Sequence, residues 1–569
     1  MKNNTLSFEI KTKADLFAQF LADKNVNAVF QLSGGMIAFL ADSIERLGKS
    51  TLINNRHEQA SGFAAEGYAR VAGQAAVAMG TSGPGATNLI TAIGSCFFDS
   101  VPALFVTGQV NQLELRHNPK QRQNGFQELD VVSIVKPIVK YAICITSDTD
   151  LQLELEKAWQ IAHDGRPGPV LIDIPIDVQQ EKIDLYIPSG ALNSAAKSSD
   201  DVERSVANLF ELLRSSKRPL ILAGGGIRAS GATNIFRDLV NKLKIPVVQS
   251  LMGIDSLDFK SEFRVGMIGS YGNSWANDAI SKTDLLICIG TRLDVRQTGT
   301  DQAGFVDGKV LFRIDLDPNE LDGRIKTKFA WNVDLFEFIT EINEYDRNLD
   351  YSHLMAEINE MKEAKPQESE QFSGLQINPS LLLEAMSKMF SNSNGYIVDV
   401  GQHQMWAAQS LQIGINQRFI TSGGMGAMGF ALPASIGAAL ANSGRWIVIA
   451  GDGCTQLSIA EFQTLASNNF PITLCVINNN QHGMVAQFQE TNMAGRFTGT
   501  RQGYSAPDFC SVASAFGIPG RKYSTISAFE EDKEFISSHS SGPMLLEFIV
   551  PNEAKALPKM GSKNSSTDL

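Results

Sequence analysis

The stretch RWIVIAGDGC, residues 445–454, decides the fold. Its apolar run, residues 446–450, ends in a Gly-Asp-Gly turn, and a helical pattern begins at Ser458. A second apolar run, residues 472–477, follows and ends in three asparagines. A strand, a helix and a second strand in this order predict a parallel βαβ unit. Because parallel strands end at one edge of their sheet, we expect Asp452 and Asn479 to lie side by side there.

These two residues suit a divalent cation and a phosphate group. Carboxylate and amide oxygens are ligands that Mg²⁺ prefers, and the glycines beside Asp452 let the main chain approach a phosphate closely. A Gly-Asp-Gly alone is more often only a turn. Followed one helix and one strand later by Asn-Asn, it resembles the diphosphate-binding motif of thiamine-diphosphate enzymes. The resemblance predicts Mg²⁺ bridging the diphosphate of that cofactor.

The same rhythm of apolar runs, glycine-rich turns and helical patterns fills three segments of the chain. Their runs are apolar on both faces, which predicts an α/β protein with three doubly wound, parallel-sheet domains. The predicted domains cover residues 1–187, 202–350 and 373–552, with polar stretches at 188–201 and 359–372 near their boundaries. The predicted helices are residues 58–71 and 86–96, and the predicted strands are residues 26–30, 52–54, 75–79, 103–107, 169–174, 218–222, 246–249, 284–289, 310–314, 395–399, 446–449 and 471–477.

The composition argues against several classes of protein. A net charge of -12 disfavours a nucleic acid as the main partner, because phosphate backbones need clustered Lys and Arg. The six cysteines lie far apart and indicate no disulfide framework, and without a CxxC pair neither a zinc ribbon nor a thioredoxin-like site is indicated. The N-terminal stretch lacks the apolar region of a secretory signal, and no apolar run reaches the ~20 residues that span a bilayer. We therefore expect a cytoplasmic protein without a membrane partner.

Thiamine chemistry also needs a carboxylate at the pyrimidine ring of the cofactor. Glu58 lies between the predicted strand at residues 52–54 and a helix that continues with Gln59. In thiamine enzymes a buried Glu binds the pyrimidine N1′, and the 4′ nitrogen can then remove the proton from the thiazolium C2. The alternative is an acid that a helix dipole favours at its N-terminus. The diphosphate motif favours the first interpretation.

Five further stretches resemble the acetolactate (acetohydroxyacid) synthases. They are NRHEQA (55–60), GFAAEGYAR (62–70), TSGPG (81–85), GQHQMWAAQ (401–409) and TSGGMGAMG (421–429). The first three resemble the pyrimidine-binding domain of that family and the last two its diphosphate-binding domain. The similarity covers nearly the whole chain. It implies a thiamine-diphosphate-dependent carboligase that decarboxylates pyruvate and transfers the acetyl-anion equivalent to an acceptor carbonyl.

The resemblance also implies roles for individual residues. Glu58 matches the partner of N1′, Met428 the residue that wedges the cofactor into a bent shape, and Gly426 the carbonyl that accepts a 4′-amino hydrogen. Phe126 and Gln127 match residues that border the reacting carbon, although core packing is an alternative for Phe126 and Met428. The residues matched to the metal and diphosphate site are Asp452, Asn479, Gln481 (through its carbonyl), His403, Gly451 and Gly453.

The middle segment resembles the flavin-binding version of this family. Turns after strands can offer N–H groups to a pyrophosphate, and acids at strand ends can bind a ribose or adenine. A lone Gly-Gly-Gly would be weak evidence, whereas five matching elements predict bound FAD, at residues 224–226, 250–253, 269–272, 290–292 and 315–317. Carboligation has no net redox step, so the flavin is expected to be structural. The residues matched to FAD contacts are Gly224, Gly225, Leu251, Met252, Gly290, Arg292 and Asp315.

Three departures from the family concern the acceptor. Phe488 stands where the biosynthetic enzymes carry a Trp that favours 2-ketobutyrate, and Ile176 replaces a usual Lys. The chain also carries extra residues within 111–124. Such a loop could meet a phosphorylated acceptor through its basic side chains, or it is an ordinary solvated loop. The basic residues in question are Arg116, His117, Lys120 and Arg122.

The acceptor and the assembly stay open at this point. The acceptor is a second pyruvate or a larger ketone such as a nucleotide-linked keto-sugar, and a pyruvate decarboxylase or oxidase of the same fold would use none. The family builds each active site from two subunits, so a homodimer or homotetramer with sites at the subunit interface is expected. The sequence does not decide between these two assemblies.

Overall fold

The computed structural model describes residues 9–118, 120–183, 186, 199–345, 349–365 and 372–558. The chain forms two compact units. The first comprises residues 1–194, 424–444 and 458–472, and the second comprises the rest. Residues 188–198 of the expected linker and residues 366–371 of the second polar stretch lie outside the described residues. Residues 199–201 do not extend the linker, because they begin helix α8 (Ser199–Ser215).

The first unit is built on a six-stranded sheet with the order β2-β1-β3-β4-β6-β5. Every pairing between these strands is parallel. The chain passes from β1 to β2 on one side of β1, and then returns to β3 on the other side of β1. The gap between β1 and β3 is therefore the topological switch point, where open α/β sheets bind ligands. The strands are β1 (Ala28–Gln31), β2 (Thr51–Asn54), β3 (Ala76–Gly80), β4 (Ala103–Gln109), β5 (Tyr141–Cys144) and β6 (Pro169–Pro175).

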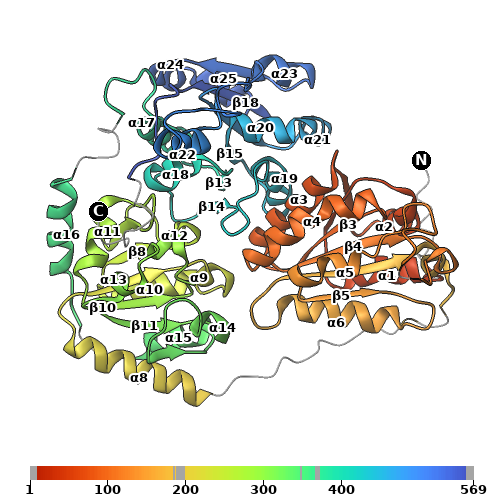
Figure 1. Ribbon diagram of the computed structural model, residues 1–569, viewed down its shortest axis with the longest axis horizontal. Helices are drawn as coiled ribbons and strands as arrows, with labels where there is room; N and C mark the ends of the chain where they lie inside the picture. Colours follow the sequence, from red (N-terminus) through yellow and green to blue (C-terminus); the bar gives the residue numbers. More distant parts are fainter. Residues whose placement is uncertain are drawn as a thin grey trace. The chain divides into compact units, whose positions relative to one another are not determined.

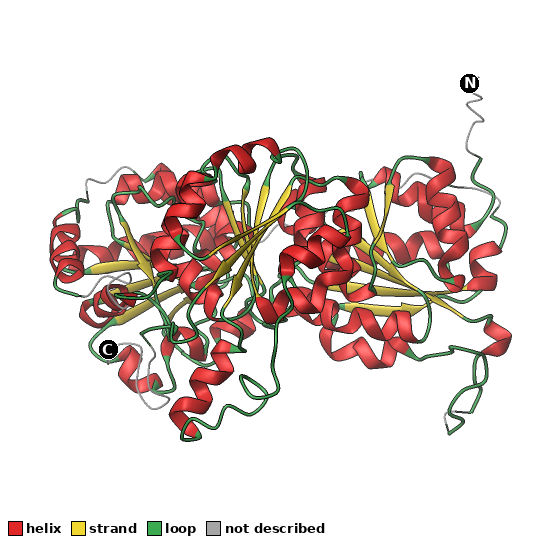
Figure 2. Cartoon of the chain, turned by 90° about the horizontal axis from the view of Figure 1, so that it is seen from above, coloured by secondary structure: helices red, strands yellow, loops and turns green. Residues whose placement is uncertain are grey.

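Helices cover both faces of this sheet, as the red and orange part of Figure 1 and the view in Figure 2 show. The helices of the first unit are α1 (Lys13–Asp23), α2 (Ala38–Leu47), α3 (Glu58–Ala72), α4 (Pro84–Phe98), α5 (Val131–Val135), α6 (Leu151–His163), α7 (Ile176–Gln180), α19 (Ala431–Ala441) and α21 (Phe462–Asn468). Leu104 and Val106 of β4 share a core cluster with Phe17 of α1. Phe105, on the opposite face, lies against Gly62 of α3. Burial on both faces explains why this run is apolar without alternation.

Two helices of the first unit approach each other at glycines. A Cβ on Gly67 of α3 would overlap the carbonyl of Ala434 in α19. A Cβ on Gly437 of α19 would overlap the carbonyl of Ala64 in α3. The two main chains therefore meet without side chains between them. Only glycine permits this approach at either position.

A buried ion network joins the same elements. The Nη2 of Arg70 lies 2.5 Å from Oε1 of Glu66 and 2.6 Å from Oδ2 of Asp99, and both carboxylates are almost fully buried. Oδ1 of Asp99 accepts the main-chain N–H of Gly424 (2.6 Å). Burial lowers the pKa of Arg70, but the two carboxylates raise it above its ordinary value, so the guanidinium stays charged. The network thus fixes the segment that starts at Gly424 onto α3 and α4.

The second unit contains two further six-stranded sheets, and the central one has the order β12-β11-β10-β7-β8-β9. Counted from β7, this is the 3-2-1-4-5-6 order of dinucleotide-binding folds, with its switch point between β7 and β10. The strands are β7 (Pro219–Ala223), β8 (Val247–Gln249), β9 (Arg264–Met267), β10 (Leu285–Ile289), β11 (Val310–Ile314) and β12 (Phe329–Trp331). The helices of this part are α8, α9 (Gly226–Ala229), α10 (Thr233–Leu243), α11 (Ser274–Lys282), α12 (Val295–Thr298), α13 (Gln302–Val306), α14 (Pro318–Leu321), α15 (Leu335–Glu344) and α16 (His353–Glu363).

The third sheet repeats the strand order of the first, as β14-β13-β15-β16-β18-β17. Its switch point lies between β13 and β15. The strands are β13 (Gly395–Val398), β14 (Arg418–Thr421), β15 (Trp446–Gly451), β16 (Ile472–Asn478), β17 (Gly520–Tyr523) and β18 (Met544–Ile549). The helices of this part are α17 (Pro379–Met389), α18 (Gln402–Ser410), α20 (Asp452–Ser458), α22 (Gly483–Asn492), α23 (Phe509–Ala515), α24 (Ile526–Glu531) and α25 (Lys533–Ser538).

The α/β class with three parallel sheets is confirmed, and each sheet lies within one predicted domain. The exact domain boundaries stay a prediction. Every strand and helix predicted by its residue range is present, with ends shifted by at most two residues. The helical pattern expected from Ser458 was placed too late, because helix α20 already begins at Asp452. Six strands were not predicted, namely β5, β9, β12, β14, β17 and β18. In the described part of the chain, no helix has both the length and the apolar character needed to cross a membrane.

We predict that Gly67→Ala destabilises the protein by about 2 kcal/mol or more, because overpacking against a main chain outweighs the better helix propensity of Ala. Thermal or denaturant unfolding followed by circular dichroism measures the effect. Gly35→Ala is the matched control, since a Cβ there meets no atom within 4 Å. A Gly67→Ala protein as stable as the control would contradict a close helix crossing.

Candidate active site

Glu58 is the first residue of α3, just after β2. Nδ1 of His57 accepts the main-chain N–H of Gln59 (3.1 Å) and caps the helix. Glu58 is only 5% exposed, and its Oε2 accepts a hydrogen bond from Nδ2 of Asn88 in α4 (2.9 Å). A Cβ on Gly85 would lie 3.2 Å from Oε1. The carboxylate is therefore buried beside the 81–85 turn, and a neutral amide is its recorded partner among the described residues.

Phe126 and Gln127 lie in the loop that follows β4. Phe126 is 80% exposed, so the core-packing alternative is wrong for this residue. Gln127 has a φ of 65°, in the left-handed region that few side chains adopt. A Cβ on Gly83 would lie 3.1 Å from the Cβ of Gln127. The structure thus brings Gln127 and Glu58 to the same turn, at residues 81–85.

Gly426 and Met428 belong to the segment that Asp99 holds through the N–H of Gly424. Gly426 has a φ of 64°, which explains why glycine is suited to this position. Met425 reaches α4, since a Cβ on Gly94 would lie 3.3 Å from its Cε. Met428 is half-buried. The segment is therefore fixed on α4, and its main chain takes a conformation that favours glycine at Gly426.

The Gly-Asp-Gly sequence lies at the switch point of the third sheet, where Gly451 ends β15 and Asp452 begins α20 without a separate turn. The main-chain N–H of Gly451 donates to Nε2 of His403 at the start of α18 (3.2 Å). Burial lowers the pKa of His403 to about 3, so the ring is neutral and serves as an acceptor. A Cβ on Gly451 would lie 2.9 Å from the Nδ1 of this ring, and a Cβ on Gly401 would lie 2.7 Å from its Cε1. The imidazole packs between Gly401 and Gly451. A larger residue at either position would overlap the ring.

Asp452 follows β15 and is 2% exposed. Burial raises the pKa of its carboxyl to about 6, although hydrogen bonds from Tyr504 and from the N–H groups of Gly453 and Gln481 oppose this rise. The Tyr504 hydroxyl donates to Oδ2 over 2.8 Å. The carboxylate is thus held by neutral donors, and no ion pair of Asp452 is recorded among the described residues. A buried carboxylate in this state favours a cation.

Asn479 and Gln481 follow β16, the strand next to β15 in the sheet. Nδ2 of Asn479 donates to Oε1 of Gln402 (3.1 Å). The side chain of Gln481 donates to the Asn552 carbonyl (2.7 Å) and accepts from Nε of Arg501 (2.6 Å). Because that amide is engaged, the main-chain carbonyl is the group of Gln481 that a metal could use. A carboxylate, an amide oxygen and a carbonyl form an oxygen-only donor set, which fits Mg²⁺.

The residues matched to FAD lie on turns that follow β7, β8, β10 and β11, so they share one edge of the central sheet. At the switch point the N–H of Gly226 donates to the carbonyl of Gly290 (3.0 Å), and a Cβ on Gly224 would overlap that carbonyl. Arg292 donates to Asp294 (2.8 Å). Glycine turns, main-chain N–H groups and a strand-end acid at this edge fit a dinucleotide. The remaining matched residues of the edge are Gly225, Leu251, Met252 and Asp315.

Sequence reasoning missed several residues that complete these sites. Asn88 binds Glu58, Tyr504 binds Asp452 and Gln402 binds Asn479. Asn88 carries a weak signal, because it lies one helical turn after the TSGPG stretch that borders Glu58. Tyr504 carries none, since it comes from a connection far along the chain.

We predict that acid destabilises the wild type more than His403→Gln. The folded-state pKa of about 3 lies below the ordinary 6.5, so the unfolded chain takes up the proton first. The stabilisation is complete above pH 6.5 and is lost as the pH falls, by about 2 kcal/mol at pH 5. Gln keeps an acceptor for Gly451 but does not titrate. Parallel losses of unfolding free energy between pH 7 and pH 5 would contradict a buried, neutral His403.

Comparison with known proteins places the chain in a family. Three domain models of thiamine pyrophosphate enzymes match it, namely the N-terminal binding domain at residues 11–134, the central domain at 206–342 and the C-terminal binding domain at 399–548. Thiamine pyrophosphate is thiamine diphosphate under its other name.

Acetolactate synthase subunits are similar over nearly the full length. The large subunit of Corynebacterium glutamicum is 33% identical over 99% of this chain and 90% of its own, and that of Lactococcus lactis is 34% identical over 96% and 93%. The mitochondrial catalytic subunit of Saccharomyces cerevisiae is 32% identical over 97% and 82%. The chain therefore belongs to the acetolactate synthase family and is a thiamine-diphosphate-dependent enzyme of that type.

Proposed function

We propose that this enzyme decarboxylates pyruvate and joins the remaining two-carbon unit to an acceptor carbonyl, using thiamine diphosphate and Mg²⁺. The observation that carries the proposal is the buried Glu58 carboxylate at the start of α3, in a chain that also holds an oxygen donor set at Asp452 and Asn479. Relatives named acetolactate synthase support the choice of pyruvate.

Thiamine diphosphate, when bound, supplies the carbon nucleophile and takes up the electron pair that the departing carboxylate leaves. Asp452, Asn479 and the Gln481 carbonyl would hold Mg²⁺ against the diphosphate. Glu58 would hold a proton at N1′ of the pyrimidine ring. Gly426 would accept a hydrogen from the 4′-amino group through its carbonyl.

We propose that FAD binds at the switch point of the central sheet and has a structural role. The strand order of that sheet and the glycine turns after β7 and β10 support a dinucleotide there. Pyruvate carboligation balances without a net transfer of electrons, so turnover requires no change in the flavin. We further propose a homodimer or homotetramer with active sites between subunits, as the resemblance implies. The cytoplasmic location stays a prediction from the sequence.

The products decide between ligation and the alternatives. We predict that enzyme supplied with thiamine diphosphate, Mg²⁺, FAD and pyruvate forms acetolactate, identified by mass spectrometry. Acetaldehyde alone would indicate a decarboxylase, and acetate with reduced flavin an oxidase. Either result would contradict the proposed ligation if added ketones do not change it.

A larger, phosphorylated ketone is a second candidate acceptor. The cations Lys120 and Arg122 are exposed on the loop that carries Phe126, which favours an anionic group there. Slow acetolactate formation, with faster ligation to a nucleotide-linked keto-sugar than to 2-ketobutyrate, would support this candidate. Equal use of 2-ketobutyrate would exclude it.

We predict that Glu58→Ala lowers kcat by about 10²–10⁴-fold, because it removes the group that holds the proton at N1′. Mg²⁺-dependent binding of thiamine diphosphate, measured by calorimetry, should be largely kept. Asp452→Ala should instead weaken the Mg²⁺-dependent binding of thiamine diphosphate, so that activity is lost when the cofactor is limiting.

Glu45→Ala is the matched control, because Glu45 is an exposed acid on α2. It should leave both cofactor binding and kcat unchanged. Full activity of Glu58→Ala would overturn the assignment of Glu58.

A further inference from the structure

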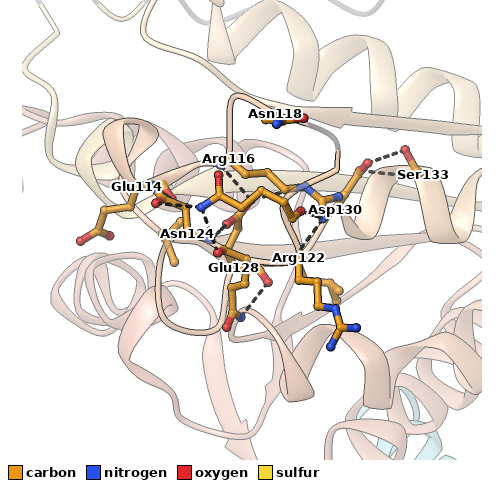
Figure 3. Close-up of polar contacts among 12 residues, drawn as sticks. Glu114, Arg116, Asn118, Arg122, Asn124, Glu128, Asp130 and Ser133 are labelled. Atoms are coloured by element: carbon orange, nitrogen blue, oxygen red, sulfur yellow. Dashed lines mark hydrogen bonds and ion pairs between the residues drawn. The ribbon is translucent and has the colours of Figure 1, made fainter.

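The segment between β4 and α5, residues 110–130, is exposed along most of its length but is not an open loop. Figure 3 shows Arg116, Asn124 and Glu128 turned toward one another, while the guanidinium of Arg122 points away. The side chains at its tip are exposed, from His117 to Asn124 where described. The order of the segment must therefore come from bonds within it and at its base.

Glu128 lies at the centre of these bonds. Its side chain is 5% exposed although the surrounding loop is on the surface. Oε1 accepts the main-chain N–H of Arg116 (2.9 Å), and Oε2 accepts that of Asn124 (2.6 Å). Burial raises the pKa of this carboxyl, but these bonds, with one from the N–H of Gly125, lower it below its ordinary value. One ionised carboxylate thus joins two parts of the loop that are distant in sequence.

Arg116 closes the other half of the loop. Its Nη1 donates to the carbonyls of Gln121 (3.3 Å) and Arg122 (3.1 Å), while its Nε lies 3.8 Å from Glu128 Oε1. Nδ2 of Asn124 adds a bond to the carbonyl of Glu114 (3.1 Å). The described parts of this loop, residues 114–118 and 120–128, are therefore joined to each other by bonds around the Arg116–Glu128 pair, as Figure 3 shows.

The base of the loop is fixed to the sheet. Nε2 of Gln109, the last residue of β4, donates to the carbonyl of Leu129 (2.7 Å) and to Oδ2 of Asp173 in β6 (2.9 Å). On the other side, the N–H of Gln112 donates to the carboxylate of Asp177 in α7 (3.2 Å). Both ends of the loop are thus tied to elements that do not depend on its tip.

Phe126 and Gln127 lie between two of these fixed points. Gly125 is buried, and a Cβ there would lie 2.9 Å from the Cβ of Glu114. Glu128 is held as described. Gln127 keeps its left-handed φ because residues on both sides are held, since such strain persists only where the surroundings impose it. Phe126 is consequently presented to solvent by a rigid frame rather than by a mobile segment.

We infer that Glu128 and Arg116 are positioning residues for the acceptor step, forming a clasp that holds Phe126 and Gln127 where the acceptor carbonyl must approach. The inference rests on the proposed carboligase function. It concerns these two residues and not Phe126 or Gln127 themselves. If the clasp is weakened, the acceptor is held less well and ligation falls, while pyruvate decarboxylation continues.

The test compares Glu128→Gln, Arg116→Met and Arg116→Lys with Glu114→Gln. The Glu114 carboxylate bonds only to Asn111 within the described loop, so it is a control on the same segment. Gln at 128 places an amide N–H₂ against a main-chain N–H, and Met at 116 removes the bonds to both carbonyls. Lys at 116 keeps the positive charge but has a single donor nitrogen in place of the guanidinium. Two readouts are needed, because one must not depend on activity.

The first readout is cleavage by trypsin after the exposed Lys120 and Arg122 in the folded enzyme. We predict that Glu128→Gln and Arg116→Met are cleaved about tenfold faster than the wild type or Glu114→Gln, as expected for the loss of a charge-assisted hydrogen bond. Arg116→Lys should be intermediate. Unchanged cleavage in Glu128→Gln would overturn the clasp.

The second readout is the ratio of ligation product to CO₂ released from pyruvate, with the KM for the acceptor. Glu128→Gln and Arg116→Met should lower the ratio and raise this KM about tenfold, while CO₂ release stays within about twofold of the wild type. A parallel fall in ligation and CO₂ release, or faster cleavage with an unchanged ratio, would overturn the positioning role. A wild type that forms no ligation product would instead refute the proposed function, and cleavage alone would then decide whether the clasp exists.

Discussion

The carboxyl ends of parallel strands lie at one edge of their sheet, and this constraint places every group considered for catalysis. In the first unit, Glu58 follows β2, the 81–85 turn follows β3 and the Phe126 loop follows β4. In the second unit, His403, Asp452 and Asn479 follow β13, β15 and β16. Within each sheet, residues that are far apart in the chain therefore lie near one another because of the strand order. Contacts between their side chains are not needed to place them.

The constraint works only because the turns at these edges can come close to one another. At the switch point of the central sheet, Gly224 lies against the carbonyl of Gly290, and at that of the third sheet Gly451 lies against His403. A larger residue at either glycine would separate the strand ends. The same is true of the α3–α19 crossing at Gly67 and Gly437, where helices replace turns. Small residues thus decide where the main chain can gather N–H and carbonyl groups around a ligand.

Much of the fold follows from local sequence, because strands buried on both faces are apolar without interruption. The strands missed by this criterion are mostly at sheet edges. β5 and β12 are only half-buried along their whole length, and β17 has exposed residues in its centre. β18 is the exception, since it is interior, and its buried Glu547 interrupts an otherwise apolar run. In β5, β12 and β17 the apolar pattern is weak because these edge strands are partly exposed. β9 and β14 are also edge strands, but three of the four residues of each are buried, so exposure does not explain why they were missed.

The candidate site was predictable to the same extent. Asp452, Asn479 and Glu58 were found because a motif at a strand end is local. Their partners Asn88 and Tyr504 were not, since each reaches its carboxylate from another element. The loop after β4 was recognised as basic and enlarged. Its internal order was invisible, because Glu128 bonds to main-chain N–H groups, which every residue possesses whatever its side chain.

The loop after β4 has a consequence for how acceptor preference can change among relatives. Among its described residues, the hydrogen bonds recorded beyond the loop are at its two ends, to Gln109, from Gln112 and from Ser133 of α5 to Asp130. A cassette of this kind can be lengthened, shortened or exchanged between homologues without disturbing the strands beneath it. A change of acceptor then requires the exchange of one surface loop, while the residues proposed to act on pyruvate stay on the sheets beneath it.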